Sequence, residues 1–258
     1  MANTVYEKKV IEAKATDLLT TGINTRSLMT IDNSLTEGEG MTKTINVYTY
    51  TGAVEKLEDG AKNSTRGSVS FVGTDYKVQR AQQVFDYSDS DYMRDNSCVE
   101  IGLKGANELM VNEMTADFFA ECAKATVAHS AATFGYEAIV DAIQKLKIED
   151  ESALFVVIPN DWKADLRKDE DYKAARMGEV IYNGQVGTIC GIPVVATNAL
   201  TDEAYVMTKE AVKCIMKKDV EVEQDRDIET KINSIVLATY YIVALVNQNK
   251  ICKLTKTA

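Results

Sequence analysis

The sequence predicts an α+β fold in which an N-terminal arm, a long β-hairpin and a long helix precede an α/β domain and returning strands. Three observations predict it. Ala153–Ile158 is a continuous apolar run, rich in β-branched residues and ended by Pro159, as is typical of a buried central strand. A helical apolar period extends over Asp89–Lys124. An alternating strand at Thr42–Thr51 leads into a long polar excursion, which is typical of an extended hairpin.

The composition is that of a soluble globular protein. The chain has 258 residues, of which 45% are hydrophobic and 26% charged, and this length suffices for one large domain or two small ones. Its 39 acidic and 29 basic residues give a formal charge of −10. This excess of acidic residues disfavours a protein that binds nucleic acid, because phosphate binding needs clustered Lys and Arg.

The five cysteines are far apart, odd in number and never in a CxxC pair, which favours free thiols in a reducing cytosol over a disulfide framework or a zinc site. They are Cys98, Cys122, Cys190, Cys214 and Cys252. Met1–Lys14 is polar and charged, unlike a signal peptide. The longest apolar stretch, Ser234–Val246, is too short to span a bilayer and predicts a buried strand.

The first part of the chain predicts extended structure. Residues 1–42 contain glycines and few clustered large apolar groups, which favours an arm that contacts a neighbour over a frayed terminus. Thr42–Thr51 and Thr74–Tyr87 alternate and are predicted to pair, joined by the polar excursion Gly52–Gly73. Because a two-stranded ribbon is not stable alone in water, we expect it to lie on another surface. The alternative is an ordinary mobile hairpin.

Asp89–Lys124 is the longest helical candidate, and residues 89–91 can cap it. Its apolar stripe consists of Val99, Leu103, Ala106, Met110, Met114, Phe118 and Cys122. A continuous helix of this span would be about 50 Å long at ~1.5 Å per residue. That length is an upper bound, because Gly102 and Gly105 can bend the helix or delay its start.

The second half of the chain alternates short helices and strands. The first predicted elements are a helix at Glu137–Leu146, the central strand, and a helix at Trp162–Lys168 that Asn160 or Asp161 caps. A hairpin around Gly184, Gly187 and Gly191 follows. Two strands come next, Val194–Thr197, which Pro193 precedes, and Ala204–Thr208. The predicted elements continue with a short helix or turn at Lys209–Cys214, an edge strand at Val220–Gln224, a charged turn at Asp225–Thr230, and strands at Ile232–Leu245 and Lys250–Leu254.

No group of residues predicts catalysis, a cofactor or a metal site. His129 is the only histidine and has no obvious partner beside it, so we expect it in a loop or at a helix end. Asp89–Glu100 places acids at calcium-loop positions, but Met93 and Arg94 stand where the loop needs an oxygen ligand and a glycine. The GQVGTICG run lacks the lysine and the following helix of a phosphate-binding loop. We therefore expect a protein that is not an enzyme.

Several of these features are shared with a known family. They are the strand that ends at Ile158 and Pro159, the helix with Leu166, Arg167 and Asp169, Tyr172, and the GTICGIPVVAT run from Gly187 to Thr197. In these residues the chain resembles the C-terminal half of the major capsid proteins of tailed bacteriophages, which have the Hong Kong 97-type fold. The order of the predicted elements is similar to that of the family over nearly the whole chain.

The resemblance implies four parts: an arm, an extended loop, a peripheral domain built on a spine helix and sheet, and an axial α/β domain. We expect the arm at residues 1–42, the extended loop at 43–87, the peripheral domain at 88–128 and 212–243, and the axial domain at 129–211 and 244–258.

The resemblance also implies a structural function, namely self-assembly into the pentamers and hexamers of an icosahedral or prolate phage head. Such a head encloses double-stranded DNA without binding it specifically, and an acidic wall suits that task. Expected contacts between subunits are Lys56, Glu58, Lys62 and Arg66 in the extended loop, and Asp225, Arg226 and Asp227 in the peripheral turn. A loop lysine is cross-linked to an asparagine in some family members, but no such partner can be placed here, so we expect none.

The implied partners are copies of the chain itself, a separate scaffolding protein, and portal and head-decoration or tail-connector proteins, with no membrane. The implied location is the virion, after assembly in the host cytoplasm. The alternative is an encapsulin-type shell of a bacterial nanocompartment. Encapsulins begin with a cargo-docking helix, whereas this chain opens with a polar arm, which favours the phage hypothesis. A third hypothesis, an α/β enzyme, needs a cleft with paired titratable groups.

Overall fold

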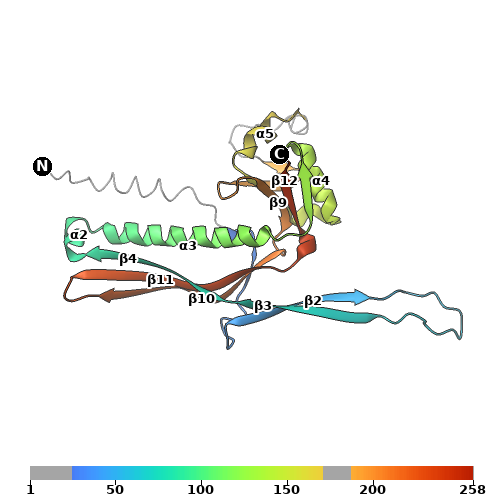
Figure 1. Ribbon diagram of the computed structural model, residues 1–258, viewed down its shortest axis with the longest axis horizontal. Coiled ribbons are helices and arrows are strands. Elements are labelled where there is room, and N and C mark those ends of the chain that lie inside the picture. The colour runs from blue at the N-terminus through green and yellow to red at the C-terminus, as the bar shows by residue number, and fades with distance from the viewer. Residues whose placement is uncertain (1–24, 171–186, 258) are drawn as a thin grey trace.

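The structure of the chain is a computed structural model that describes residues 25–170 and 187–257. It contains a six-stranded sheet, a four-stranded sheet with a long helix laid along it, and a two-stranded hairpin that projects away from both (Figure 1). Within the described ranges, three short 3-10 helices lie in the connections: η1 (Thr25–Ser27), η2 (Glu151–Ala153) and η4 (Gln248–Lys250). Residues 1–24 of the expected arm, Tyr172 and Gly184 lie outside the described residues.

The six-stranded sheet is built around the predicted central strand. Its order is β5 (Ala128–Ala131), β12 (Ile251–Lys256), β9 (Glu203–Thr208), β6 (Leu154–Pro159), β8 (Ile192–Thr197) and β7 (Thr188–Ile189). β6 is buried along its whole length and pairs with β8 in parallel and with β9 antiparallel. A strand enclosed on both faces and both edges needs apolar residues at every position, which explains the uninterrupted run in the sequence.

Helices α4 (Tyr136–Leu146) and α5 (Trp162–Lys168) form where the sequence predicts them and pack on this sheet. The side-chain cap predicted for α5 is wrong. Asp161 is the N-cap residue, but its backbone is helical, with φ −64° and ψ −33°, and its side chain makes no capping bond. A side-chain N-cap needs an extended backbone at that residue. Instead, the carbonyl of Asn160 accepts a hydrogen bond from the Lys163 N–H at 3.2 Å.

Helix α4 is capped from another segment. Its N-cap residue is Gly135, and the Asp169 carboxylate, just after α5, accepts a hydrogen bond from the Tyr136 N–H at 2.7 Å. A Cβ on Gly135 would lie 2.4 Å from the same carboxylate oxygen, so the approach of the carboxylate requires glycine. The link ties α5 to the start of α4.

Replacing Asp169 with Ala is expected to lower the free energy of unfolding by about 1 kcal/mol, the typical cost of losing an N-cap. Urea denaturation of the purified chain measures this value. Asp165→Ala is the matched control, because it removes only a surface ion pair with Lys256 at 3.8 Å, which contributes little. Equal midpoints for the two variants would contradict the capping role.

The four-stranded sheet has the order β1 (Thr30–Asp32), β10 (Val212–Arg226), β11 (Ile232–Leu245) and β4 (Gln79–Ser88). β11 has the predicted bounds. The turn predicted at Lys209–Cys214 is confirmed for residues 209–211 only, because β10 begins at Val212 and continues through the predicted edge strand. The start of β10 lies between β1 and β11, so its backbone bonds to both neighbours. Register shifts between Met216 and Glu221 interrupt the pairing of β10 with β11.

The predicted hairpin forms, but its second strand begins and ends earlier in the chain than predicted. β2 (Thr42–Thr51) pairs with β3 (Ser68–Lys77) over ten residue pairs, whereas the rest of the predicted strand is β4, which pairs with β11. The two strands separate at Val78, which is 2% exposed and packs with Ile215 and Ala244. The predicted pairing of Thr42–Thr51 with Thr74–Tyr87 is therefore confirmed for residues 74–77 and wrong for the rest, and the polar excursion shortens to residues 52–67.

The long helix forms in two pieces, α2 (Asp89–Arg94) and α3 (Cys98–Cys122). The break falls at Asp95, which is extended and whose carboxylate accepts a hydrogen bond from the Ser97 N–H at 2.9 Å. Ser88, rather than residues 89–91, caps α2 through its Oγ. α3 therefore spans about 37 Å at ~1.5 Å per residue instead of the predicted 50 Å.

The apolar stripe of α3 faces the sheet. Its members Ala106, Met110, Met114, Phe118 and Cys122 are buried, as the sequence predicts. Gly102 lets α3 pack closely on this sheet, because a Cβ at that position would lie 2.5 Å from the Phe85 ring of β4. Glycine lets the helix approach the strand closely.

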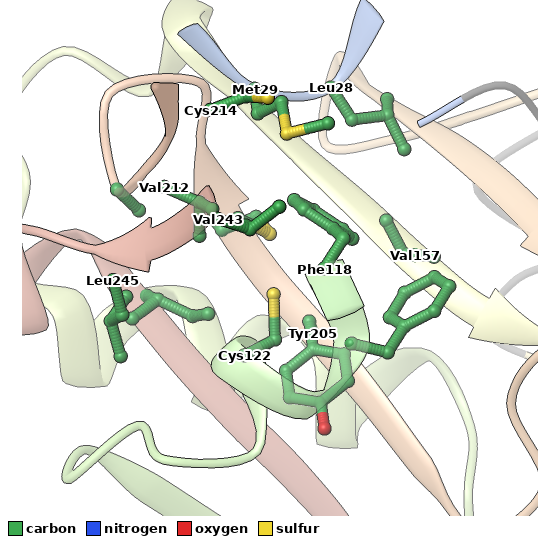
Figure 2. Packing of buried hydrophobic residues seen from close by; sticks show 14 of the residues in the cluster. Leu28, Met29, Phe118, Cys122, Val157, Tyr205, Val212, Cys214, Val243 and Leu245 are labelled. Carbon is green, nitrogen blue, oxygen red and sulfur yellow. The ribbon is translucent and has the colours of Figure 1, made fainter. Parts of the chain in front are cut away.

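The C-terminal end of α3 joins the two sheets through one core. Phe118 and Cys122 contact a cluster that includes Tyr205 of β9, Val212 of β10 and Val243 of β11 (Figure 2). Phe118 packs edge-on against the neighbouring Phe119 ring, with centroids 5.2 Å apart. Because the cluster draws on both sheets, we expect them to move as one body.

All five cysteines are free, as predicted. Cys122, Cys214 and Cys252 are buried, and burial raises the pKa of each of these thiols. Thiols held protonated in this way react slowly. Among the described residues, no helix combines the length and the apolar character needed to cross a membrane.

Candidate intersubunit surfaces

The hairpin of β2 and β3 presents an apolar surface to solvent. Opposite residues on the two strands share a face, which places Tyr48 beside Phe71 and Tyr50 beside Val69. The exposed fractions of Tyr48, Tyr50 and Phe71 are 66%, 70% and 66%, and the rings of Tyr48 and Phe71 are 6.0 Å apart. We call Tyr48, Tyr50, Val69 and Phe71 the aromatic face.

The other face of the hairpin is also uncovered. Val47 lies opposite Val72, both exposed, and hydroxyl side chains flank the pair. The hairpin is anchored only at its base, where the Tyr76 hydroxyl donates to the Leu245 carbonyl at 3.3 Å. Exposed aromatic and aliphatic side chains on a free ribbon mark a surface that another molecule covers.

The four residues expected in the extended loop lie at the hairpin tip, residues 52–67. Lys56, Glu58, Lys62 and Arg66 are all exposed. Their side chains make no hydrogen bond or ion pair with the described part of the chain, so their charges are available to another molecule. Their contact with a second subunit stays a prediction.

The residues expected in the peripheral turn lie at the opposite end of the molecule, where β10 turns into β11 (Figure 1). Asp225 and Arg226 end β10. The guanidinium of Arg226 donates to the Asp89 carboxylate at 2.6 Å. Asp227 shapes the turn, since its carboxylate accepts from the Thr230 hydroxyl at 2.8 Å. Arg226 and Asp227 thus bond within the subunit, and their contact with neighbours stays a prediction.

Asp89 connects α2 to this turn. Besides the bond from Arg226, its carboxylate accepts from the Asn233 side-chain N–H at 2.9 Å. Its own N–H donates to the Lys231 carbonyl at 3.1 Å. The hydrogen bonds from Asn233 and Arg226 lower the pKa of Asp89 below its ordinary value of 3.8.

These bonds predict a pH dependence at the distal end. Because the folded-state pKa of Asp89 is lowered, its contribution to stability is full at neutral pH and is lost only as the pH falls through the lowered value. An NMR titration of Asp89 is therefore expected to have its midpoint below 3.8. Asn233→Ala should raise that midpoint by removing the largest cause. A midpoint at or above the ordinary value in the unaltered chain would contradict this account.

Sequence reasoning missed an apolar patch at the same end. Met93 in α2 is 83% exposed, Ile228 in the turn is 76% exposed, and Tyr92 is half exposed. We call Tyr92, Met93 and Ile228 the distal patch. Their signal in the sequence was weak, because they are few, stand among charged residues and belong to no apolar period.

The position of His129 differs from the prediction. His129 lies in strand β5 rather than in a loop or at a helix end, and its Nε2 is 3.7 Å from an Asp141 carboxylate oxygen. In the described ranges, no group of three or more His, Cys, Asp or Glu side chains could hold a metal ion. The end of the GQVGTICG run forms a tight hairpin with positive φ at Cys190 and Gly191.

No protein-family model matches the chain. A curated relative, the major capsid protein of Staphylococcus phage phiMR11, is 32% identical over 121 residues, which cover 45% of this chain and 44% of the relative. The chain thus matches less than half the length of that relative.

Solved capsids are similar over nearly the whole chain. The capsid of cyanophage P-SCSP1u has a TM-score of 0.74 at 11% identity, covering 89% of this chain and 86% of that one. The capsid of a native GTA particle has a TM-score of 0.73 at 14% identity and covers 93% and 94%. A virus-like particle from Pyrococcus furiosus has a TM-score of 0.61 at 13% identity and covers 95% and 98%.

The chain therefore has the fold of shell-forming proteins, the Hong Kong 97-like capsid fold, as the resemblance implied. Within that class, its sequence similarity is to the major capsid protein of a phage.

Proposed function

We propose that the chain is the major capsid protein of a tailed bacteriophage, a structural subunit that self-assembles into the shell of the phage head. The observation that carries this proposal is the projecting hairpin, whose aromatic face is uncovered in the single subunit. Support comes from the capsid fold and from the similarity to a phage major capsid protein.

The geometry suggests how such a shell is held together. A hairpin that docks on the next copy is a head-to-tail contact, and repeated head-to-tail contacts close into rings such as pentamers and hexamers. A closed shell also needs contacts that join rings, and the distal patch lies at the end of the molecule away from the hairpin (Figure 1). Many such contacts, each weak alone, sum to a stable lattice.

The remaining parts of the proposal follow from the resemblance. They include the domain boundaries given above, with the extended loop now ending at Lys77, because β4 belongs to the four-stranded sheet. They also include the scaffolding, portal and decoration or connector partners, and the intersubunit contacts of Lys56, Glu58, Lys62, Arg66, Asp225, Arg226 and Asp227. Assembly takes place in the host cytoplasm, and the finished shell encloses double-stranded DNA. The net charge of −10 suits a wall that does not hold the DNA.

The encapsulin alternative has the same fold and is not favoured over the phage hypothesis. The sequence similarity is to a phage capsid protein. An encapsulin would form closed shells that contain an enzyme rather than DNA, so the contents of native particles distinguish the two hypotheses.

Electron microscopy of the purified chain tests the proposal. We expect closed shells or capsid-like fragments at high protein concentration, and DNA protected from nuclease in native particles. A species that stays monomeric at high concentration, with the hairpin folded onto its own body, would refute the proposal and revive the enzyme hypothesis.

A further inference from the structure

The hairpin tip is ordered by a single carboxylate. Residues 52–67 lie beyond the last strand pair, Thr51 with Ser68, and contain no helix or strand. Across this loop the Glu55 carboxylate accepts three hydrogen bonds, from the Ser64 N–H at 2.9 Å, the Ser64 hydroxyl at 2.5 Å and the Thr65 N–H at 2.9 Å. Both carboxylate oxygens are used. Glu55 therefore closes residues 55–65 into a smaller loop.

A second feature shapes the inside of this smaller loop. The Ala61 N–H donates to the Glu58 carbonyl at 3.0 Å, and Gly60 between them has a φ of +88°. This turn reverses the chain at the apex, while Glu55 joins its two sides. The lysines expected to contact a neighbour, Lys56 and Lys62, lie within the closed loop, and Arg66 follows it directly.

Such closure matters because the tip has no core of its own. Fixing the backbone of one residue costs about 1–2 kcal/mol of conformational entropy, so an open loop of this length would resist ordering on a partner. Hydrogen bonds from backbone N–H groups to an ionised carboxylate are among the stronger ones in proteins. The bond from the Ser64 hydroxyl, together with those from the Ser64 and Thr65 N–H groups, holds the pKa of Glu55 at about 2, so the carboxylate stays charged at neutral pH.

We propose that Glu55 is a positioning residue for assembly, which preorganises the hairpin tip so that Lys56, Lys62 and Arg66 meet a second copy of the chain with little loss of freedom. This inference rests on the proposed function. It assigns Glu55 a role through Ser64 and Thr65 of its own subunit, and not through direct contact with the neighbour. A loop already shaped for its partner binds faster and more tightly than one that must be ordered on binding.

The test is a double-mutant cycle on Glu55 and Ser64. Glu55→Gln removes the charge and weakens all three bonds, whereas Ser64→Ala removes one donor and leaves the Glu55 charge in place. If Glu55 acts through Ser64, the two changes are coupled, and the double variant assembles little more slowly than Glu55→Gln alone. If Glu55 instead contacts the neighbour, the effects on the assembly rate multiply, and the proposal fails.

Two readouts are needed. Hydrogen exchange in the unassembled subunit should show the Ser64 and Thr65 amides exchanging roughly tenfold faster in Glu55→Gln, the effect of losing about 1.4 kcal/mol of local protection. Light scattering should show shell formation slowed by a similar factor. Asp59→Asn is the charge-matched control for exchange, since it removes one charge from the same tip without touching these bonds.

The outcomes separate this inference from the proposed function. Shells that form from Glu55→Gln at the unaltered rate, despite faster amide exchange, would overturn the positioning role and leave the capsid function standing. Unchanged exchange at Ser64 and Thr65 would overturn it as well. An unaltered chain that never assembles would refute the proposed function, and this inference with it.

Discussion

Replacing Tyr48, Tyr50 and Phe71 together with Thr is expected to abolish shell formation while leaving the subunit folded. Burying one such side chain contributes about 1.5–3 kcal/mol, so the triple variant loses much of what one intersubunit contact can supply. The loss recurs at every hairpin in the lattice. Thr keeps the strand propensity of these positions, so the hairpin itself should persist.

The measurement combines electron microscopy and sedimentation for assembly with thermal unfolding for the subunit. Because the three side chains are about two-thirds exposed in the single subunit, their loss should change its stability by only about 0.5 kcal/mol. A separate variant with Tyr48→Phe and Tyr50→Phe keeps the rings. It should assemble like the unaltered chain, since the rings and not the hydroxyls provide the apolar area. Normal shells from the triple Thr variant would contradict the role of the aromatic face.

Phe118→Ala is expected to cause the largest loss of stability in the subunit, about 3–5 kcal/mol. Phe118 is fully buried where α3 meets both sheets, and its ring packs against Phe119. Truncation leaves a cavity that rigid strands from two sheets cannot fill. Because the free energy of unfolding of a domain is only about 5–15 kcal/mol, the variant would lose much of it.

Urea denaturation under conditions that prevent assembly measures this loss as a shift in the midpoint. Leu109→Ala is the matched control on the same helix, because Leu109 is 55% exposed and its truncation leaves no closed cavity. We expect its cost to be below about 1 kcal/mol. Similar losses of unfolding free energy in the two variants would show that the junction of α3 with the two sheets is not the main core.

The candidate surfaces were only partly predictable. The exposed charges of the tip, such as Lys56 and Lys62, stand out in the sequence because a polar excursion separates two strands. The aromatic face does not, because a Tyr or Phe in an alternating strand is equally consistent with a covered sheet. The use of Arg226 within the subunit depends on Asp89, which is 137 residues away along the chain.

Local periodicity sufficed wherever a segment's own side chains decide its structure. The buried run of β6, the stripe of α3 and the bounds of β11 follow from the spacing of apolar residues, because burial selects the same residues in any similar fold. Pairing is different. β2 could bond to any alternating strand, and its partner became β3 because Val78 is buried among Ile215 and Ala244.

The sequence by itself therefore determined the fold class, the order of the main elements, the burial of β6 and the buried stripe of α3. Only the tertiary structure decided which strands pair, where the long helix breaks, and that Glu55 closes the hairpin tip. The physical reason is that the first set depends on the burial of neighbouring side chains, whereas the second depends on hydrogen bonds and contacts between residues that the chain path brings together.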